Sequence, residues 1–177
     1  MKKITLLFSM ILLFSCSSKI TKKYDYSITN IRSLIKSYNK NIDNSKLENI
    51  IFYVNKYSVE NNIEPKLVFS LIARESSFKD NIVSKSGAIG LGQLLYSTAK
   101  DLGINNPFDI EENIKGTIKY LKKMLILCNN NIDLALASYK MGYYSVSKII
   151  NSGNRLPENT INYINDIKRE YQRIIID

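Results

Sequence analysis

Apolar residues recur every three or four positions along most of the chain, with polar residues between them. Such stretches run over 28–38, 45–60 and 65–76, and further ones follow over 109–128, 132–142, 145–153 and 156–177. This spacing matches the turn of an amphipathic helix, and no run alternates with a period of two for long enough to form a convincing strand. The chain is therefore predicted to be all-α, with helices of modest length.

Local signals place the starts of three of these helices. Ser45 followed by Glu48 has the spacing of a capping box, so the main domain is expected to begin at Ser45. Pro65 is suited to the first turn of the next helix, because the N–H that proline lacks would have no partner there. Asp109 with Glu112 is expected to cap the long helix that follows.

Glu75 interrupts an apolar face. Val68, Leu71 and Ile72 lie on one face of the helix after Pro65, and Glu75 falls next on that face. Apolar neighbours one and two turns back remove water from the carboxyl group and raise its pKa, and the negative end of the helix dipole raises that pKa further. A glutamic acid that is protonated near neutral pH can donate a proton to a glycosidic oxygen. Taken alone, such a residue more often reaches solvent or pairs with a nearby cation.

The composition excludes several kinds of site. The chain has no histidine, which excludes Ser-His-Asp and Cys-His nucleophilic sites and HExxH zinc sites. Two cysteines, Cys16 and Cys128, make no disulfide framework. A net charge of +9 is compatible with an acidic polymer or an anionic lipid as partner, or with ordinary lysine enrichment of a solvated surface. Nucleic acid is disfavoured because no dense Lys/Arg block occurs.

The N-terminus has the pattern of a secretion signal. "MKK" is followed by "ITLLFSMILLF", an apolar run too short to span a bilayer. The segment "LFSCSSK" resembles the lipobox of bacterial lipoproteins, which implies cleavage after residue 15 and a lipid on Cys16. Ser17 would then favour the periplasmic face of the outer membrane. The alternative is an ordinary signal peptide with an incidental cysteine. Residues 16–44 are interpreted as the lipidated cysteine, a tether and a possible short helix, and 45–177 as the main domain.

Four motifs in the main domain occur in a familiar order. They are "ARESSF" (73–78), "SKSGAIGLGQLL" (84–95), "LALASYKMG" (134–142) and "LPENTINYI" (156–164). In this order and spacing they resemble the soluble lytic transglycosylase (SLT) domain, and the likeness runs from about residue 50 to 172. The resemblance implies a mainly helical, lysozyme-like fold that cleaves peptidoglycan between N-acetylmuramic acid and N-acetylglucosamine. The domain at 45–177 is therefore expected to be catalytic and to act as a monomer.

The resemblance also implies roles for individual residues. Glu75 matches the single catalytic acid/base of the family. Substrate-binding positions carried over by the motifs are Ser77, Ser84, Gly90, Leu91, Gln93, Tyr139, Lys140 and Tyr163. No metal and no organic cofactor is called for.

Most of these positions also have a structural interpretation. Ser77 could simply end a helix, and Gly90 could serve only turn geometry. Tyr139 and Tyr163 could be core aromatics with satisfied hydroxyls. For Gln93 a functional role is favoured, because an amide opening a helix among glycines is suited to bind the hydroxyl or acetamido groups of a sugar.

The chain departs from the family pattern at several positions. Gly92 stands where the family usually has methionine, Lys140 where it has asparagine, and Asn159 where it commonly has glutamate. Lys140 is ambiguous: a cation there would lower the pKa of Glu75, which opposes the acid role, or it would bind a carboxylate of the substrate.

Three functions compete for this domain. No second catalytic carboxylate is evident, and nothing in the pattern places Asp80 opposite Glu75. This agrees with the family mechanism, in which the C6 hydroxyl of muramic acid attacks its own C1 and leaves a 1,6-anhydro end. The rivals are a hydrolytic muramidase on the same fold and a non-catalytic peptidoglycan-binding lipoprotein. The motif residues Ser77, Ser84 and Gln93 beside Glu75 argue against lost activity.

Overall fold

A computed structural model describes residues 27–174 of the chain. Its elements in order are α2 (Ile28–Tyr38), α3 (Asn44–Asn61), α4 (Pro65–Ser76), β1 (Ala88–Ile89), β2 (Leu94–Leu95), α5 (Tyr96–Asp101), α6 (Ile110–Leu127), α7 (Ile132–Met141), α8 (Tyr143–Asn151) and α9 (Glu158–Arg173). The mainly helical fold is as the sequence predicts. The two short strands form an antiparallel hairpin that pairs Ala88 with Leu95 and Ile89 with Leu94.

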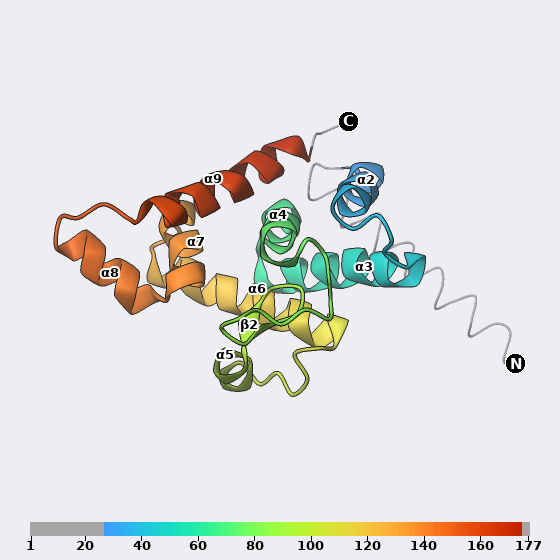
Figure 1. Ribbon diagram of the computed structural model, residues 1–177, viewed down its shortest axis with the longest axis horizontal. Coiled ribbons are helices and arrows are strands. Elements are labelled where there is room, and N and C mark those ends of the chain that lie inside the picture. The colour runs from blue at the N-terminus through green and yellow to red at the C-terminus, as the bar shows by residue number, and fades with distance from the viewer. Residues whose placement is uncertain (1–26, 175–177) are drawn as a thin grey trace, which may run out of the picture.

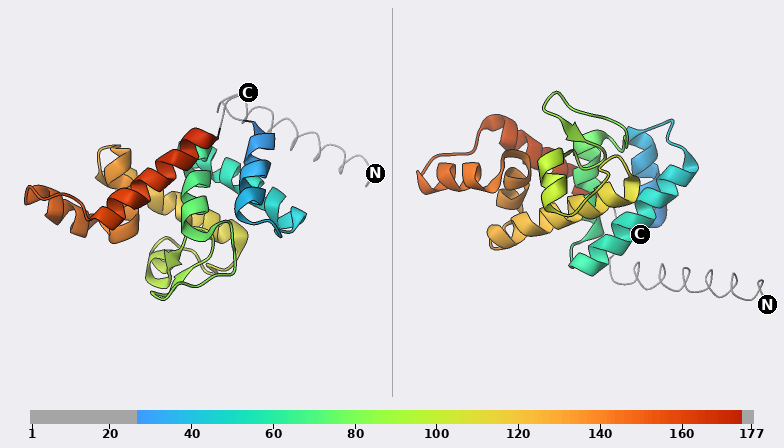
Figure 2. Two further views of the ribbon diagram at one scale, coloured as in Figure 1. Left: turned by 45° about the horizontal axis from the view of Figure 1, so that its top comes forward. Right: turned by 90° about the horizontal axis from the view of Figure 1, so that it is seen from below.

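Helix α4 lies at the centre of the fold, and the other helices pack around it (Figure 1). It packs against α9 on one side and against α3 on another, while α3 also packs along α6. Helices α7 and α8 lie at one end of the molecule and α2 at the other, and the hairpin with α5 lies beside α6 (Figure 2). The end of α4 is therefore held from several directions.

The sequence of α4 explains its central place. Val68, Phe69, Leu71 and Ile72 have no exposed surface, so the helix is apolar on more than one face. A helix that is hydrophobic nearly all round is stable only when neighbours cover it on every side. Burying each of these side chains contributes about 1.5–3 kcal/mol.

The helix starts confirm two of the three predictions. Pro65 is the first residue of α4. The Asp109 side chain accepts a hydrogen bond from the Glu112 N–H at 2.9 Å and caps α6. The predicted capping box at Ser45 is wrong: Asp43 caps α3 by accepting hydrogen bonds from the N–H groups of Ser45 and Lys46.

Two residues near the expected start of the domain therefore have other roles. Ser45 lies inside the first turn of α3, one residue after its start at Asn44. Glu48 pairs with Arg32 of α2 at 2.7 Å instead of returning to the backbone. Asp43 caps the helix in place of Ser45 because it lies directly before the first helical residue, and because its carboxylate carries a charge that the helix dipole favours.

Helix α2 is an integral part of the packed core. Ile31 and Ile35 are fully buried, and α2 packs on both α3 and α4. The possible helix over 28–38 is thus present, and the folded unit includes it. Placing the catalytic domain at 45–177 stays a prediction. The predicted signal peptide at 1–15, the predicted lipidation site at Cys16 and the predicted tether as far as residue 26 lie outside the described residues.

No helix within residues 27–174 has both the length and the apolar character that crossing a bilayer requires.

Candidate active site

Glu75 lies in the last turn of α4, where the chain turns sharply. Ser77 and Phe78 both adopt left-handed backbone conformations, with φ of 54° and 57°, and the Ser77 N–H bonds to the Ala73 carbonyl. Two successive residues of this kind are unfavourable outside glycine, so their surroundings must hold them. The buried Phe78 ring and the residues that contact it therefore fix where α4 ends and where the Glu75 carboxyl group is placed.

Helix α2 supplies part of that support. The Asn39 side-chain amide donates to the Phe78 carbonyl at 3.1 Å. The Tyr38 ring meets the Phe78 ring edge-on, with centroids 6.1 Å apart. These contacts link a helix from the start of the described chain to the turn that follows Glu75.

The Glu75 side chain opens into a pocket of about 450 Å³. Four of the predicted substrate-binding residues line it with Glu75: Ser84, Gln93, Tyr139 and Lys140. Six further residues that the sequence analysis did not assign complete the lining: Ser86, Ala88, Leu94, Leu95, Thr98 and Tyr120. The pocket thus brings together residues from α4, the 84–95 segment, α5, α6 and α7.

The surroundings of Glu75 keep its carboxyl group protonated to higher pH than usual. Burial is the largest influence and raises the pKa of Glu75. The Tyr163 hydroxyl donates a hydrogen bond to Glu75 Oε1 at 2.5 Å, which favours the carboxylate and lowers that pKa in part. Desolvation prevails over the hydrogen bond and over the nearby cations, so the net shift is upward.

Two cations flank Tyr163. The guanidinium of Arg74 lies 5.4 Å and the Lys140 Nζ 5.0 Å from the centroid of the Tyr163 ring. Both charges also lower the pKa of Glu75, by less than burial raises it. Arg74 is itself paired with Asp166 at 3.0 Å. The effect of Lys140 on the pKa of Glu75 that the sequence suggested is therefore present but secondary.

The segment 90–93 forms the turn of the β1–β2 hairpin. Gln93 has a φ of 50°, and its side-chain Nε2 donates to the Gly90 carbonyl at 2.9 Å. The expectation that Gln93 opens a helix is wrong, because α5 begins three residues later at Tyr96. The turn needs Gly90, whose φ is 72° and whose added Cβ would lie 2.4 Å from the Asn113 side chain.

Asn113 of α6 holds this turn in place. Its Nδ2 donates to the carbonyls of Ile89 and Pro107, at 3.0 and 2.6 Å, and its Oδ1 accepts from the Gly92 N–H at 2.8 Å. The side chain is 1% exposed, so all of these bonds are made out of water. Sequence reasoning missed Asn113, although a polar residue next to Ile114 on the core-facing side of a helix was a signal for it.

Gly92 fits tightly against α6. An added Cβ would lie 1.8 Å from Thr117 Oγ1, so a methionine at this position would require the Thr117 side chain to shift. The Tyr139 hydroxyl donates to the Gly92 carbonyl at 2.7 Å and joins α7 to the same turn. The departure from the family pattern at Gly92 is therefore accompanied by local close packing.

The predicted substrate-binding residues differ in whether they line the pocket. Ser84 lines the pocket, where its Oγ accepts from the Ala88 N–H at 3.0 Å and lies 3.0 Å from the Ser86 Oγ. Leu91 is fully buried in the core. Ser77, Gly90, Leu91 and Tyr163 do not line the pocket, and among them Tyr163 reaches the site through its bond to Glu75.

Glu75 is the one carboxylic acid among the residues that line the pocket. Asp80 pairs with Lys46 of α3 at 2.6 Å and does not line it. Over residues 27–174, no group of three or more Cys, Asp or Glu side chains is arranged to hold a metal ion. The arrangement can accordingly donate and accept one proton at one carboxyl group.

A family model described as the transglycosylase SLT domain matches residues 52–162, which is more than half of the chain. The chain belongs to this family. The match includes Glu75 and all of the residues that line the pocket with it.

Individual proteins with similar sequences are also named as transglycosylases. A membrane-bound lytic murein transglycosylase F of Photobacterium profundum is 35% identical over 94 residues, which are 50% of this chain and 18% of that protein. A transglycosylase of Enterobacteria phage PRD1 is 36% identical over 85 residues, which are 48% of this chain and 32% of that protein. The chain thus matches less than a third of the length of either relative.

The fold agrees as well. The 70-kDa soluble lytic transglycosylase of Escherichia coli superposes with a TM-score of 0.62 at 22% identity, over 69% of this chain and 23% of that one. The predicted lysozyme-like, mainly helical fold of the SLT domain is thereby confirmed.

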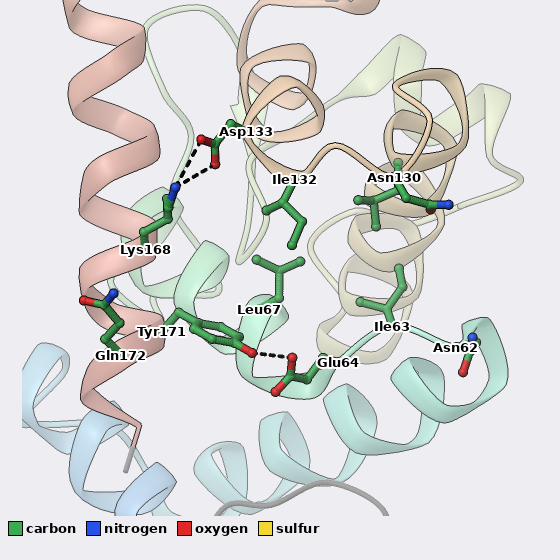
Figure 3. A pocket seen from close by; sticks show the side chains of 11 residues that line it. Asn62, Ile63, Glu64, Leu67, Asn130, Ile132, Asp133, Lys168, Tyr171 and Gln172 are labelled. Carbon is green, nitrogen blue, oxygen red and sulfur yellow. Dashed lines mark hydrogen bonds and ion pairs between the residues drawn. The ribbon is translucent and has the colours of Figure 1, made fainter. Parts of the chain in front are cut away.

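This SLT domain has a second cavity near the other end of α4. It has a volume of about 480 Å³, and Ile63, Leu67 and Ile132 contribute its apolar surface (Figure 3). The Lys168 Nζ donates to both oxygens of Asp133, and the Tyr171 hydroxyl donates to Glu64. Asp133 in this cavity is thus paired with a cation, whereas no cation forms an ion pair with Glu75 in the part of the chain that the structure describes.

Proposed function

We propose that this chain is a peptidoglycan lytic transglycosylase. It cleaves the β-1,4 bond between N-acetylmuramic acid and N-acetylglucosamine, and Glu75 is its single general acid and base. The observation that carries the proposal is a carboxyl group with a raised pKa, alone among acids, in a pocket large enough for a sugar residue. Membership of the SLT family and the fold of the soluble transglycosylase support the same activity.

In the first step Glu75 acts as an acid. Its proton passes to the oxygen that bridges the two sugars, and the bond from that oxygen to C1 of muramic acid breaks. The N-acetylglucosamine leaves with a neutral hydroxyl group. Burial raises the pKa of Glu75, which favours the protonated acid that this step requires.

In the second step the same group acts as a base. The C6 hydroxyl of muramic acid attacks C1 of its own ring, and its proton passes to the Glu75 carboxylate. The acid is restored, no water is consumed, and the product ends in a 1,6-anhydro ring. The Tyr163 hydroxyl stabilises the transient carboxylate through its hydrogen bond.

The other pocket residues would bind the sugars. Ser84, Gln93, Tyr139 and Lys140 place hydroxyl, amide and ammonium groups around Glu75, and Leu94 and Leu95 add apolar surface. This mixture suits N-acetylated sugars, which combine hydroxyl groups with an apolar methyl. For Tyr163, which contacts Glu75, we propose a role in positioning the acid in place of the sugar contact expected from the motif.

The test is the product that the purified protein releases from peptidoglycan sacculi. Wild-type protein is expected to give muropeptides with 1,6-anhydro ends, which lack one water relative to reducing ends by mass spectrometry. Glu75→Gln keeps the shape of the side chain but cannot donate the proton, so release should fall by at least about a thousandfold.

Each rival predicts a different product. Reducing ends in place of anhydro ends would establish a muramidase. Binding of sacculi without release of any fragment would establish a non-catalytic wall protein. Full activity of Glu75→Gln would remove Glu75 from the mechanism.

We also propose that the chain is anchored in the cell envelope through a lipid on Cys16, facing the periplasm from the outer membrane. The lipobox-like "LFSCSSK" segment supports this location. The Cys16→Ala variant should lose incorporation of labelled fatty acid and move from the membrane fraction to the soluble one. Unchanged labelling and fractionation would contradict the anchor.

A further inference from the structure

Lys140 is one of the residues that line the pocket containing Glu75. It lies in the last turn of α7, its side chain is solvent-accessible, and it lines the pocket together with Gln93 and Ser84. The Lys140 Nζ donates one hydrogen bond, at 2.7 Å, to the carbonyl of Asn159, in the first turn of α9. It also lies 5.0 Å from the centroid of the Tyr163 ring. The ammonium group is therefore fixed in direction by backbone and aromatic contacts.

No carboxylate of residues 27–174 forms an ion pair with Lys140. Seven other cations in this part of the chain are paired with a carboxylate: Arg32, Lys46, Lys56, Arg74, Lys168, Arg169 and Arg173. An ammonium group has three N–H donors, so two remain after the bond to Asn159. The nearby Asp166 is already bonded by Arg74 and Arg169.

Glu75 does not form an ion pair with Lys140 either. The Tyr163 hydroxyl already donates to Glu75 Oε1, and desolvation favours the uncharged carboxylic acid. Lys140 is the one cation among the residues that line the pocket, and neither Glu75 nor Asp166 forms an ion pair with it. The pocket is therefore complementary to a glycan that carries a negative group near the bond to be cleaved.

We propose that the Lys140 ammonium group binds a carboxylate of the glycan strand and thereby determines which strands this pocket prefers. Peptidoglycan has two sources of such a group. A muramic acid without a stem peptide has a free carboxylate on its lactyl ether, and a stem peptide has carboxylates of its own. The inference rests on the proposed function in one respect, that the ligand is a peptidoglycan strand. The position of Lys140 does not depend on that function.

Binding is measured with the full chain in the Glu75→Gln background, which does not require turnover. Three kinds of glycan strand are compared: strands stripped of peptides by an amidase, the same strands with lactyl carboxylates converted to neutral methylamides, and peptide-bearing strands. Lys140→Met removes the charge, and Lys140→Arg retains it. Lys148→Met is the matched control, because Lys148 is an exposed lysine on α8 that does not line the pocket.

We expect Lys140→Met to raise the Kd for carboxylate-bearing strands about tenfold, as for the loss of one charge-assisted hydrogen bond. Lys140→Arg should stay within about twofold of the parent, and Lys148→Met should not change the Kd. A loss confined to stripped strands, and absent on their methylamides, assigns the lactyl carboxylate as the ligand. A loss confined to peptide-bearing strands assigns the stem peptide.

Two results would overturn the inference. One is an equal loss of affinity for stripped strands and for their neutral methylamides, which would mark Lys140 as a merely structural residue. The other is an unchanged Kd for every strand. Failure of the proposed function is seen separately, as the absence of anhydro products from wild-type protein with Glu75 and Lys140 both intact.

Discussion

At the scale of single residues, Glu75 is placed between opposing influences on its proton. Burial raises its pKa, while the Tyr163 hydroxyl, Arg74 and Lys140 each favour the carboxylate. An acid/base catalyst needs both tendencies, since it must hold a proton before the bond breaks and exist briefly as a carboxylate afterwards. The balance is made by residues from α4, α7 and α9, which lie far apart in the sequence.

Removal of the Tyr163 hydroxyl should change the pH dependence of cleavage. In Tyr163→Phe the hydrogen bond that lowers the pKa of Glu75 is lost, so that pKa rises. The alkaline limb of kcat/KM, where Glu75 loses its proton, should move to higher pH, and kcat should fall roughly 10- to 100-fold. Tyr171→Phe, which removes a hydroxyl from the second cavity, should leave the profile unchanged. A downward shift of the alkaline limb in Tyr163→Phe would contradict the role of this bond.

The buried acid should also make the fold less stable at neutral and alkaline pH. The pKa of Glu75 is higher in the folded than in the unfolded state, so its stabilising contribution is complete below the unfolded pKa and is lost as pH rises through the folded pKa. Glu75→Gln does not titrate. Its Tm should exceed the wild-type Tm by a few degrees at about pH 8, and by much less at about pH 4. A difference that is constant over this range in thermal unfolding would contradict the pKa shift.

At the scale of elements, the turn after α4 connects the site to α2. Ser77 and Phe78 keep left-handed conformations because Phe78 is packed into the core and its carbonyl is bonded by Asn39. Helix α2 thereby stabilises the position of Glu75 without touching the pocket. Its contribution is open to measurement, since the bond can be removed without disturbing the buried face of α2.

Asn39→Ala should weaken both the fold and the site. Loss of the bond to the Phe78 carbonyl should lower the free energy of unfolding by about 1 kcal/mol and reduce kcat severalfold. Arg32→Ala, within α2, the helix that Asn39 caps, breaks an exposed pair with Glu48 and should cost less than about 1 kcal/mol with no change in kcat. Urea unfolding and initial rates on sacculi measure the two effects. Equal kcat values for the two variants would exclude a link from α2 to the site.

The sequence predicted elements where the deciding chemistry is local. Pro65 and Asp109 mark helix starts because each acts on backbone groups within one turn. Ser45 misled because Asp43, an equally good cap, lies two residues earlier. The β1–β2 hairpin was not predicted, since two-residue strands carry no periodic signal. Asn113 was missed because its bond to the Ile89 carbonyl crosses 24 residues and exists only in the folded chain.

Within the site, sequence patterns identified Glu75 and four residues that share its pocket, but not how each one acts. The bond from Tyr163 to Glu75 depends on the packing of α9 against α4, which no motif contains. Leu91 and Gly90 belong to the motif through packing and turn geometry, and they do not line the pocket. The motifs therefore indicated which residues lie near the site. Burial and hydrogen bonding in the folded chain showed which of them line the pocket and which only support its structure.

At the scale of the whole molecule, the net charge is +9 for the full sequence, and loss of Lys2 and Lys3 with the proposed signal peptide leaves +7 (9 minus 2), which should attract an acidic wall polymer. Raising the salt concentration shortens the screening length, which is about 10 Å at 0.1 M. The KM for sacculi should therefore rise with salt, while kcat changes little. Sacculi with amidated carboxylates provide the control and should show a much weaker dependence. Identical salt dependence for both substrates would mean that the basic surface has no part in substrate capture.

The account as a whole depends on the protonation state of Glu75 in the folded chain. The most direct measurement is an NMR titration of carboxyl carbons in labelled protein, with the Glu75 signal assigned by its absence from Glu75→Gln. We expect the pKa of Glu75 to lie clearly above the ordinary value of 4.5 for this side chain, and to rise further in Tyr163→Phe. A pKa at or below 4.5 would contradict the proposed role of Glu75 as the acid that cleaves the glycan.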